Sequence, residues 1–209
     1  MAVVSAVSTR AGVTMLRLGS LILFLFALAA GGNAAYLQLK AALAQHLLDL
    51  AWSNSQLEGK PVKPWPWADT WPVARLSIPE LDKTLIVLEG TSGEAMAFGP
   101  GRLTQSALSV SGVVGIGGHR DTHLAFLEDL PLGSLLELEL INGQQAQYIY
   151  AHQQILDTRR DSLKFSTTNA GLVLITCYPF SASQTGGPMR YVATAVPFAK
   201  LNMMAEHEG

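Results

Sequence analysis

Two strand ends in this chain contain residue types that could carry out nucleophilic chemistry. Cys177 follows the apolar, β-rich run 172–176 and precedes a Tyr-Pro pair, so its thiol is expected at a strand end. His119 has the same setting, after another apolar run and two glycines. A thiol becomes a strong nucleophile when an imidazole accepts its proton, and that imidazole can be distant in the sequence. The two strand ends therefore predict a Cys–His pair, provided that their strands are neighbours.

Arg190 is the third candidate, because it opens the last predicted strand after a Gly-Gly-Pro loop. A guanidinium does not act as a base at neutral pH, but it can donate to a substrate carbonyl or to a developing oxyanion. Taken alone, such an arginine is an ordinary surface residue, and a single cysteine is more often a buried core residue. The catalytic hypothesis therefore depends on the three residues together.

A metal site is the competing interpretation of the histidines. His119 and His123 have the spacing of the paired histidines in zinc protease helices, with Asp121 between them. Those motifs require a helix and a glutamate directly after the first histidine, whereas Arg120 follows here. We therefore expect no metal and no cofactor. The remaining histidines are expected in solvent: His46, His152 and His207.

Composition excludes several classes of protein. The chain has 209 residues, a net charge of −2 and one cysteine. It lacks the concentrated basic charge that a nucleic-acid partner requires. One cysteine excludes an internal disulfide and a multi-cysteine zinc site. Once the apolar segment near the N-terminus is set aside, the remaining length suits one globular domain.

Residues 18–39 form an apolar run that is long enough to cross a bilayer as a helix. Arg10 and Arg17 precede the run and no acidic residue does, which places the N-terminus in the cytoplasm and the domain outside. We expect a single-pass protein of the cytoplasmic (inner) membrane with its domain on the extracytoplasmic side. A cleaved signal peptide ending near Ala27-Leu28-Ala29 is one alternative, and a buried core helix is a weaker one.

The rest of the chain divides by composition. Residues 40–52 continue a helical pattern whose apolar face could lie on lipid or on the domain, and 59–72 read as an extended linker rich in proline and tryptophan. The expected parts are a cytoplasmic N-terminus (1–17), a transmembrane anchor (18–39), a helical stalk and linker (40–72), a catalytic domain (73–198) and a C-terminal tail (199–209).

The domain is predicted to be mainly β. Short strands separated by turn residues are typical of a closed barrel or a sandwich. Short helices are expected at 92–98 and 123–129. The strands are expected at 73–78, 85–88, 111–117, 134–140, 147–156, 172–176 and 191–196.

Taken in order, these motifs resemble the sortase family of cysteine transpeptidases over residues 73–198. The matching stretches are Gly118-His119-Arg120, Val173-Leu174-Ile175-Thr176-Cys177, Arg190-Tyr191, Ala74-Arg75-Leu76-Ser77-Ile78-Pro79 and Ala97-Phe98-Gly99-Pro100-Gly101. Val173 stands where the family usually has threonine, so no role is assigned to it. The string that begins at His119 is similar to class D and E sortases and to those of marine proteobacteria.

The resemblance implies a closed eight-stranded β-barrel and a mechanism. Cys177 would attack a peptide carbonyl in an LPxTG-like sorting signal and form a thioester. His119 would protonate the leaving amine and then deprotonate the incoming one, while Arg190 would bind substrate and support the oxyanion. In the family no metal takes part in the chemistry, although some members bind structural calcium, which the sequence leaves undecided. The resemblance also implies one wall of the peptide groove at residues 157–171, and we expect a monomer. Three further residues are expected at the substrate-binding site: Thr176, Gly118 and Asp121.

Two other functions stay open at this point. The first is another exported cysteine protease or acyltransferase, although the sequence strings of papain-like enzymes and L,D-transpeptidases are absent from the sequence. The second is a membrane-tethered β domain that binds a partner and keeps an inert, buried cysteine. The amine acceptor, and whether the thioester goes to an amine or to water, are left undecided by the sequence.

Overall fold

A computed structural model describes residues 3–163, 165, 169–182, 184 and 186–199, with side chains from residue 15 onward. The chain separates into two compact units, Met1–Ala44 and Gln45–Gly209. Helix α1 (Val3–Glu58) begins in the first unit and ends in the second. The single helix thus replaces the separate anchor and stalk helices that the sequence suggested.

The first unit consists of α1 alone within the described residues. Its large apolar side chains between Met15 and Leu39 are exposed. The helix is long and apolar enough to cross a membrane by length and composition, and its position near the N-terminus also suits a signal sequence. Protein does not bury its apolar stretch, whereas a core helix, the weaker alternative from the sequence, would be buried.

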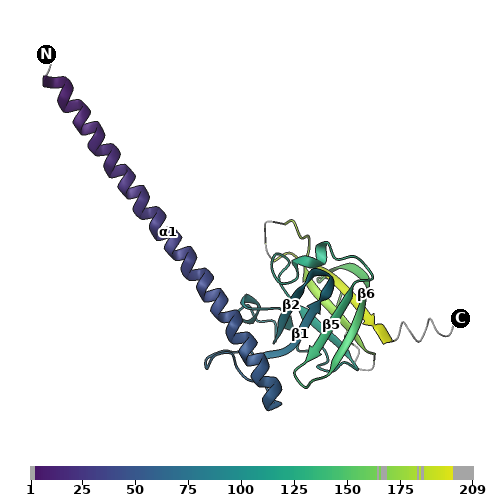
Figure 1. Cartoon of the computed structure of the whole chain (residues 1–209). Coiled ribbons are helices and arrows are strands. Elements are labelled where there is room, and N and C mark those ends of the chain that lie inside the picture. Colours follow the sequence, from purple (N-terminus) through teal and green to yellow (C-terminus); the bar gives the residue numbers. More distant parts are fainter. Residues whose placement is uncertain (1–2, 164, 166–168, 183, 185, 200–209) are drawn as a thin grey trace. The chain divides into compact units, whose positions relative to one another are not determined.

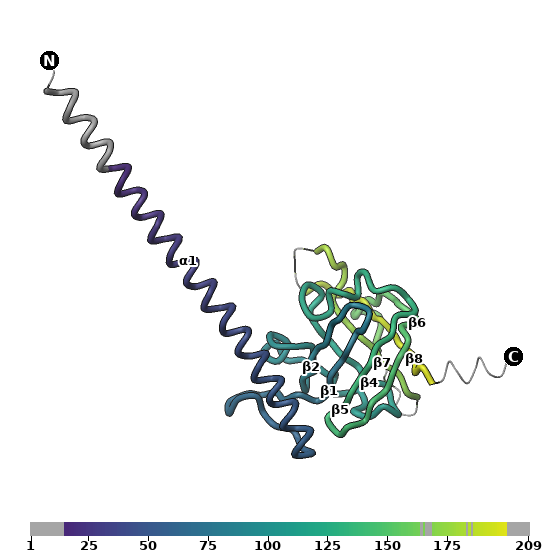
Figure 2. The backbone as a smooth tube through the Cα atoms, in the orientation of Figure 1, coloured from purple at the N-terminus to yellow at the C-terminus, as the bar shows by residue number. Residues whose placement is uncertain are grey.

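The second unit contains a closed barrel with the strand order β1-β2-β3-β4-β7-β8-β6-β5. Figure 1 shows β1, β2, β5 and β6 on one side of the barrel, and Figure 2 labels β4, β7 and β8. The strands are β1 (Pro72–Ile78), β2 (Lys83–Glu89), β3 (Gly101–Arg102), β4 (Val113–Gly117), β5 (Leu135–Leu140), β6 (Gln145–Asp157), β7 (Gly171–Cys177) and β8 (Met189–Pro197).

Seven of these strands lie where the sequence predicted them, so the prediction of a mainly β, closed barrel is confirmed. The eighth, β3, was missed because it has two residues and no β-rich pattern. It exists through tertiary pairing, parallel to β2 and antiparallel to β4. The two predicted short helices are 3-10 turns, η2 (Ala95–Ala97) and η3 (Ala125–Glu128), and a third, η1 (Pro79–Leu81), was not predicted.

Alternate residues of the strands fill the barrel. On β4, Val114 and Ile116 point into the core, and on β7 Leu172 and Leu174 do so. This period of two is the signature of a sheet that is buried on one face. The outward-facing residues of the same strands take no part in this core.

The C-terminal end of α1 packs against the barrel within the second unit. Trp52 is 1% exposed, and the guanidinium of Arg75 on β1 lies over its ring at 5.2 Å from the centroid. Gln56 Nε2 donates to Glu139 Oε1 at 2.9 Å. This face of the helix therefore lies on the domain, which answers the question that its sequence pattern left open.

The segment between α1 and β1 is neither helix nor strand, as its prolines predicted. Gly59 ends the helix with φ +65°, a left-handed conformation that glycine adopts without strain. Trp65 packs edge-on against Phe98, with ring centroids 4.9 Å apart, while Trp67 is exposed. The segment is therefore held on the domain by Trp65 and by Trp71, which packs against the hydrophobic core.

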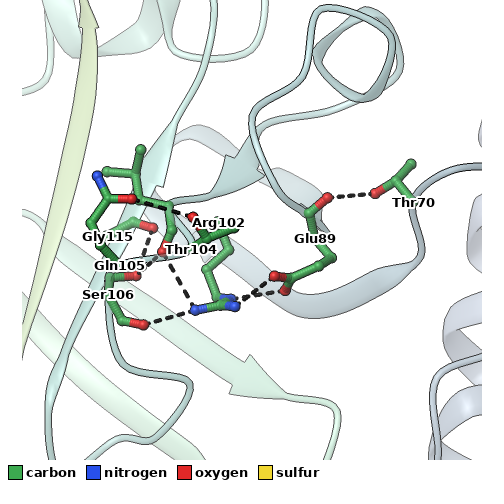
Figure 3. Close-up of polar contacts among 8 residues, drawn as sticks. Thr70, Glu89, Arg102, Thr104, Gln105, Ser106 and Gly115 are labelled. Atoms are coloured by element: carbon green, nitrogen blue, oxygen red, sulfur yellow. Dashed lines mark hydrogen bonds and ion pairs between the residues drawn. The ribbon is translucent and has the colours of Figure 1, made fainter.

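An ion pair between Glu89 and Arg102 fastens β2 to β3. Arg102 donates from Nη2 and Nε to the two carboxylate oxygens of Glu89, at 2.6 and 2.9 Å. Its Nη1 donates to the Ser106 carbonyl at 2.7 Å, and Thr70 Oγ1 donates to the Glu89 carbonyl at 2.8 Å. Figure 3 shows Arg102 between the carboxylate and the following loop. The adjacent Gly101 has no room for a side chain, since a Cβ there would lie 1.9 Å from the Gly90 carbonyl oxygen.

Candidate active site

The three candidate strands are direct neighbours in the barrel. β4 runs parallel to β7, and β7 runs antiparallel to β8. In this register Gly117 lies opposite Ile175, and Cys177 lies opposite Arg190. Directly opposed residues on antiparallel strands have Cβ atoms about 5 Å apart. The end of β7 and the start of β8 thus bring Cys177 and Arg190 together.

Cys177 and Arg190 share the outward face of the barrel. Leu172 and Leu174 on β7 point inward, so by alternation Cys177 points outward. On β8, Tyr191 points inward, and its hydroxyl lies 2.7 Å from that of the core residue Tyr150. Its neighbour Arg190 therefore points outward. Cys177 and Arg190 are both partly exposed.

His119 continues the same row from β4. The parallel pairing extends one residue beyond the strand, because the Gly118 amide donates to the Ile175 carbonyl at 3.1 Å. The next residue, His119, is then level with Cys177, and it is exposed. His119, Cys177 and Arg190 therefore lie at one end of three adjacent strands, which is the juxtaposition that the sequence argument required. Their catalytic roles remain predictions.

Thr176 and Gly118 hold this arrangement from inside. Thr176 is 2% exposed, and its Oγ1 donates to the Gly118 carbonyl at 2.8 Å. A Cβ on Gly118 would lie 2.9 Å from Cγ of Leu124, so a side chain there would displace that core residue. Both residues were expected at the substrate-binding site. Their contacts indicate that they hold the two strand ends together.

A tight turn follows His119. The Leu124 amide donates to the His119 carbonyl at 3.0 Å, which closes the turn. Within it, the rings of His119 and His123 have centroids 6.3 Å apart. Burial lowers the pKa of His123 below its usual value, and the charges of His119 and Lys83 lower it further against the opposing effect of Asp121. His123 is therefore neutral near pH 7, and Asp121, expected to contact substrate, is exposed.

Arg190 is only partly engaged by the protein. Its Nη1 donates to the carbonyls of Gly187 and Met189, at 2.6 and 2.9 Å. Within the described part of the chain, no carboxylate pairs with Arg190. Among the described residues, its Nε and Nη2 make no hydrogen bond, so their hydrogens could donate to a substrate carbonyl.

The outward side of β4 and β7 beside this row is apolar and largely covered. Val173 and Ile175 on β7 face outward, next to Gly115 and Gly117 on β4, and of these four only Ile175 is partly exposed. A Cβ at Gly115 would lie 2.7 Å from the ring of Phe165, which belongs to the β6–β7 connection. The backbone of β4 thus has an aromatic ring directly against it. The predicted groove wall at 157–171 includes Phe165, although parts of that segment lie outside the described residues.

Other predicted and possible sites can now be placed. His46 and His152 are exposed as expected, and His207 lies outside the described residues. Among the described residues, no group of three or more potential metal ligands comes together. A cavity of about 560 Å³ lies against β1, β5, β6 and the C-terminal end of β8, and no described residue of β4 or β7 lines it. Arg120, which the sequence argument did not single out, is buried beside His119.

Comparison with known proteins agrees with this geometry. A family model described as a sortase domain matches residues 76–198. No curated protein is similar enough in sequence to count as a match. Several solved sortase structures share the fold at 24% identity or less.

Three of those structures illustrate the likeness. Sortase A from Corynebacterium diphtheriae is 24% identical, with a TM-score of 0.54 over 63% of this chain and 62% of its own length. Sortase A from Listeria monocytogenes is 20% identical, with a TM-score of 0.53 over 60% of this chain and 86% of its own. A Clostridium perfringens sortase D5 transpeptidase is 15% identical, with a TM-score of 0.58 over 75% and 99%. The chain thus spans just under two thirds of the Corynebacterium structure.

Proposed function

Because this chain belongs to the sortase family of cysteine transpeptidases, we propose that Cys177 is the nucleophile of a transpeptidase that cleaves peptide bonds. The observation that supports the proposal is the row of His119, Cys177 and Arg190 on β4, β7 and β8. It combines a thiol, a proton acceptor and a cationic donor at one level of the sheet. This is the minimum set for acyl transfer through a thioester.

The first half-reaction forms the thioester. The thiol proton of Cys177 passes to His119, the sulfur attacks the carbonyl carbon of the scissile peptide bond, a carbon–sulfur bond forms, and the carbonyl oxygen becomes an oxyanion. The free N–H groups of Arg190 donate to that oxygen, which is where negative charge develops. When the carbon–nitrogen bond breaks, His119 supplies the proton that the departing amine needs.

The second half-reaction releases the product. An incoming amine attacks the thioester carbonyl and gives its proton to His119, which has become neutral. The carbon–sulfur bond breaks, the new peptide is released, and His119 returns its proton to the Cys177 sulfur, so that both groups are as they began. If water attacks in place of the amine, the result is hydrolysis. Dividing acyl transfer in this way replaces one difficult step with two easier ones.

The substrate we propose is a protein that carries an LPxTG-like sorting signal. Ile175, partly exposed on the outward face of β7 two residues before Cys177, supports an apolar contact with the signal beside the nucleophile. The string of residues from His119 to His123 further suggests a class D or E relative, or one from the marine proteobacterial group. We also propose that the protein acts as a monomer and without nucleic acid.

A single thiol in the chain makes the nucleophile directly testable. A vinyl sulfone or methanethiosulfonate reagent should add one label to the folded full-length protein, on Cys177, and should abolish cleavage of a fluorescent peptide that contains Leu-Pro-Ala-Thr-Gly. Mass spectrometry of protein incubated with the peptide should detect the thioester. If the thiol reacts only after unfolding, Cys177 is a structural core residue, and the alternative of a tethered binding domain takes the place of the enzyme.

We further propose that α1 anchors the protein in the cytoplasmic membrane, with the barrel on the extracytoplasmic side. The exposed apolar stretch of α1 and the arginines before it support this orientation. A membrane-impermeant methanethiosulfonate reagent should label Cys177 in intact spheroplasts. N-terminal sequencing of the membrane-bound protein then separates a retained anchor from a signal peptide that is cleaved near Ala29.

A further inference from the structure

Arg120 is the one charged residue that is buried among those whose side chains the structure describes, at 8% exposure. It directly follows His119 in the sequence. Its Nη2 donates to the carbonyls of Ala182 and Gln184, at 2.5 and 2.6 Å. Hydrogen bonds from an ionised donor are shorter and stronger than neutral ones, so this contact fixes both partners firmly.

The setting of Arg120 is costly for a structural role alone. Within the described residues, no carboxylate pairs with Arg120. Removing a cation from water without an opposite charge is unfavourable. An apolar side chain of similar volume often makes the folded protein at least as stable as the buried charge does. Arg102, by contrast, lies beside a carboxylate that neutralises it. Arg120 therefore calls for an explanation other than stability.

The two carbonyls that bind Arg120 belong to the connection between β7 and β8. This connection follows Cys177, the last residue of β7, and ends where β8 begins at Met189, one residue before Arg190, so it links two residues of the proposed site. Arg190 Nη1 donates to the Gly187 carbonyl near the other end of the same connection. One arginine beside His119 and one in the row with Cys177 thus hold the same loop at two points.

We propose that Arg120 is a positioning residue for the transpeptidase reaction. Its guanidinium fixes the β7–β8 connection against the turn that bears His119. It thereby sets the position of His119 relative to Cys177 and Arg190 when peptide is bound. Arg120 touches no reacting atom in this scheme. The kinetic consequence of this inference rests on the proposed function. The contact between Arg120 and the β7–β8 connection, here called the latch, is a property of the folded chain alone.

The test compares Arg120→Met and Arg120→Lys with the wild type in the full-length protein. Methionine keeps much of the volume and removes both the charge and the donors. Lysine keeps a charge and donors without the planar fork of a guanidinium. The control is Arg75→Met on β1, which loses the contact with Trp52 and an ion pair with Glu139 on the far side of the barrel.

Two measurements are made on each variant: amide hydrogen exchange over residues 178–187, and kcat and KM on the fluorescent Leu-Pro-Ala-Thr-Gly peptide. Arg120→Met should raise exchange in this segment at least about tenfold, the effect of losing charge-assisted hydrogen bonds. It should lower kcat about a hundredfold, since small displacements of catalytic groups have effects of this size. KM should change less than about threefold, and Arg120→Lys should recover part of both losses.

Each other outcome is decisive. Unchanged exchange over 178–187 in Arg120→Met overturns the latch. Faster exchange with unchanged kcat overturns the positioning role, as does an equal loss of kcat in Arg75→Met. If the wild type leaves the peptide intact, the proposed function has failed. The inference is then decided by comparing wild type with Arg120→Met in amide exchange over 178–187 and in the alkylation rate of Cys177. Where Arg120→Met does not fold, the same criteria apply to Arg120→Lys.

Discussion

Two polar groups on neighbouring strands of the barrel differ in how much of their bonding capacity the protein itself uses. Glu89 and Arg102 engage each other through two hydrogen bonds, and their side chains are only 19% and 12% exposed. His119, Cys177 and Arg190 lie closer to solvent, and no carboxylate in the described structure pairs with Arg190. Polar groups that stabilise the fold use their hydrogen-bonding capacity within the protein. Polar groups that act on a substrate keep donors and acceptors available for that substrate.

Removing the imidazole should have the largest effect in this comparison. His119→Ala is expected to lower kcat/KM for the fluorescent peptide by about 10²- to 10⁴-fold, the usual contribution of a general acid–base group. The midpoint of urea unfolding should stay close to that of the wild type, because His119 is exposed. The matched control is His152→Ala, which removes an exposed imidazole from β6 and should leave activity unchanged. Full activity in His119→Ala would falsify the acid–base role.

Arg190 offers the next largest effect. Arg190→Ala is expected to lower kcat by about 10²- to 10³-fold, comparable to the loss of one oxyanion donor. Arg190→Lys should recover little, because a lysine ammonium lacks the planar geometry that lets Arg190 bind loop carbonyls and a substrate together. Arg160→Ala, at an exposed position, serves as the control. Equal losses in the two alanine variants would show that only net charge matters.

Arg102→Met should show the reverse behaviour. It leaves the largely buried carboxylate of Glu89 without its partner, and breaking such pairs costs about 3 kcal/mol. The free energy of unfolding, measured in urea by circular dichroism, should fall by that amount. At a temperature where the variant is folded, kcat should change less than about threefold, a small effect on the scale of catalytic losses. A large loss of kcat with unchanged stability would make Arg102 part of the site.

The smallest effect concerns pH. The pKa of His123 is lowered in the fold, chiefly by burial, so the unfolded chain binds a proton at His123 more readily than the folded chain does. Its contribution to stability is therefore complete above pH 6.5 and declines as pH falls through the folded pKa. His123→Gln should flatten the dependence of the urea midpoint between pH 7.5 and 5, and His152→Gln should not. Identical slopes in the two variants would contradict the assignment.

The sequence predicted those parts of the fold that local patterns encode. Short apolar, β-rich runs between turn residues located seven strands, and prolines located the irregular segment before β1. It could not predict β3, because Gly101 and Arg102 form a strand only through their neighbours. The side of the helix that carries Trp52 was equally undetermined, since an apolar face suits lipid and protein alike.

The candidate site shows the same division. The residue types and strand-end positions of His119, Cys177 and Arg190 were visible in the sequence, because turn residues mark where each strand ends. Their alignment in one row depends on the register of β4, β7 and β8, which only long-range pairing sets. The contacts of Thr176 and Arg120 were missed for this reason: each bonds a carbonyl about 60 positions away.

The parallel pairing of β4 with β7 has a consequence for when the protein becomes reactive. Such a pair cannot form as a local hairpin, because Gly118 and Thr176, which it joins, are 58 positions apart. Contacts of this range form late, once the entropy of closing the intervening chain has been overcome. Under the proposed mechanism, a newly made chain would lack the pairing of Cys177 with His119 until the barrel closes. Enzymatic competence would then emerge as a property of the completed fold, and immature copies would be harmless to the polypeptides around them.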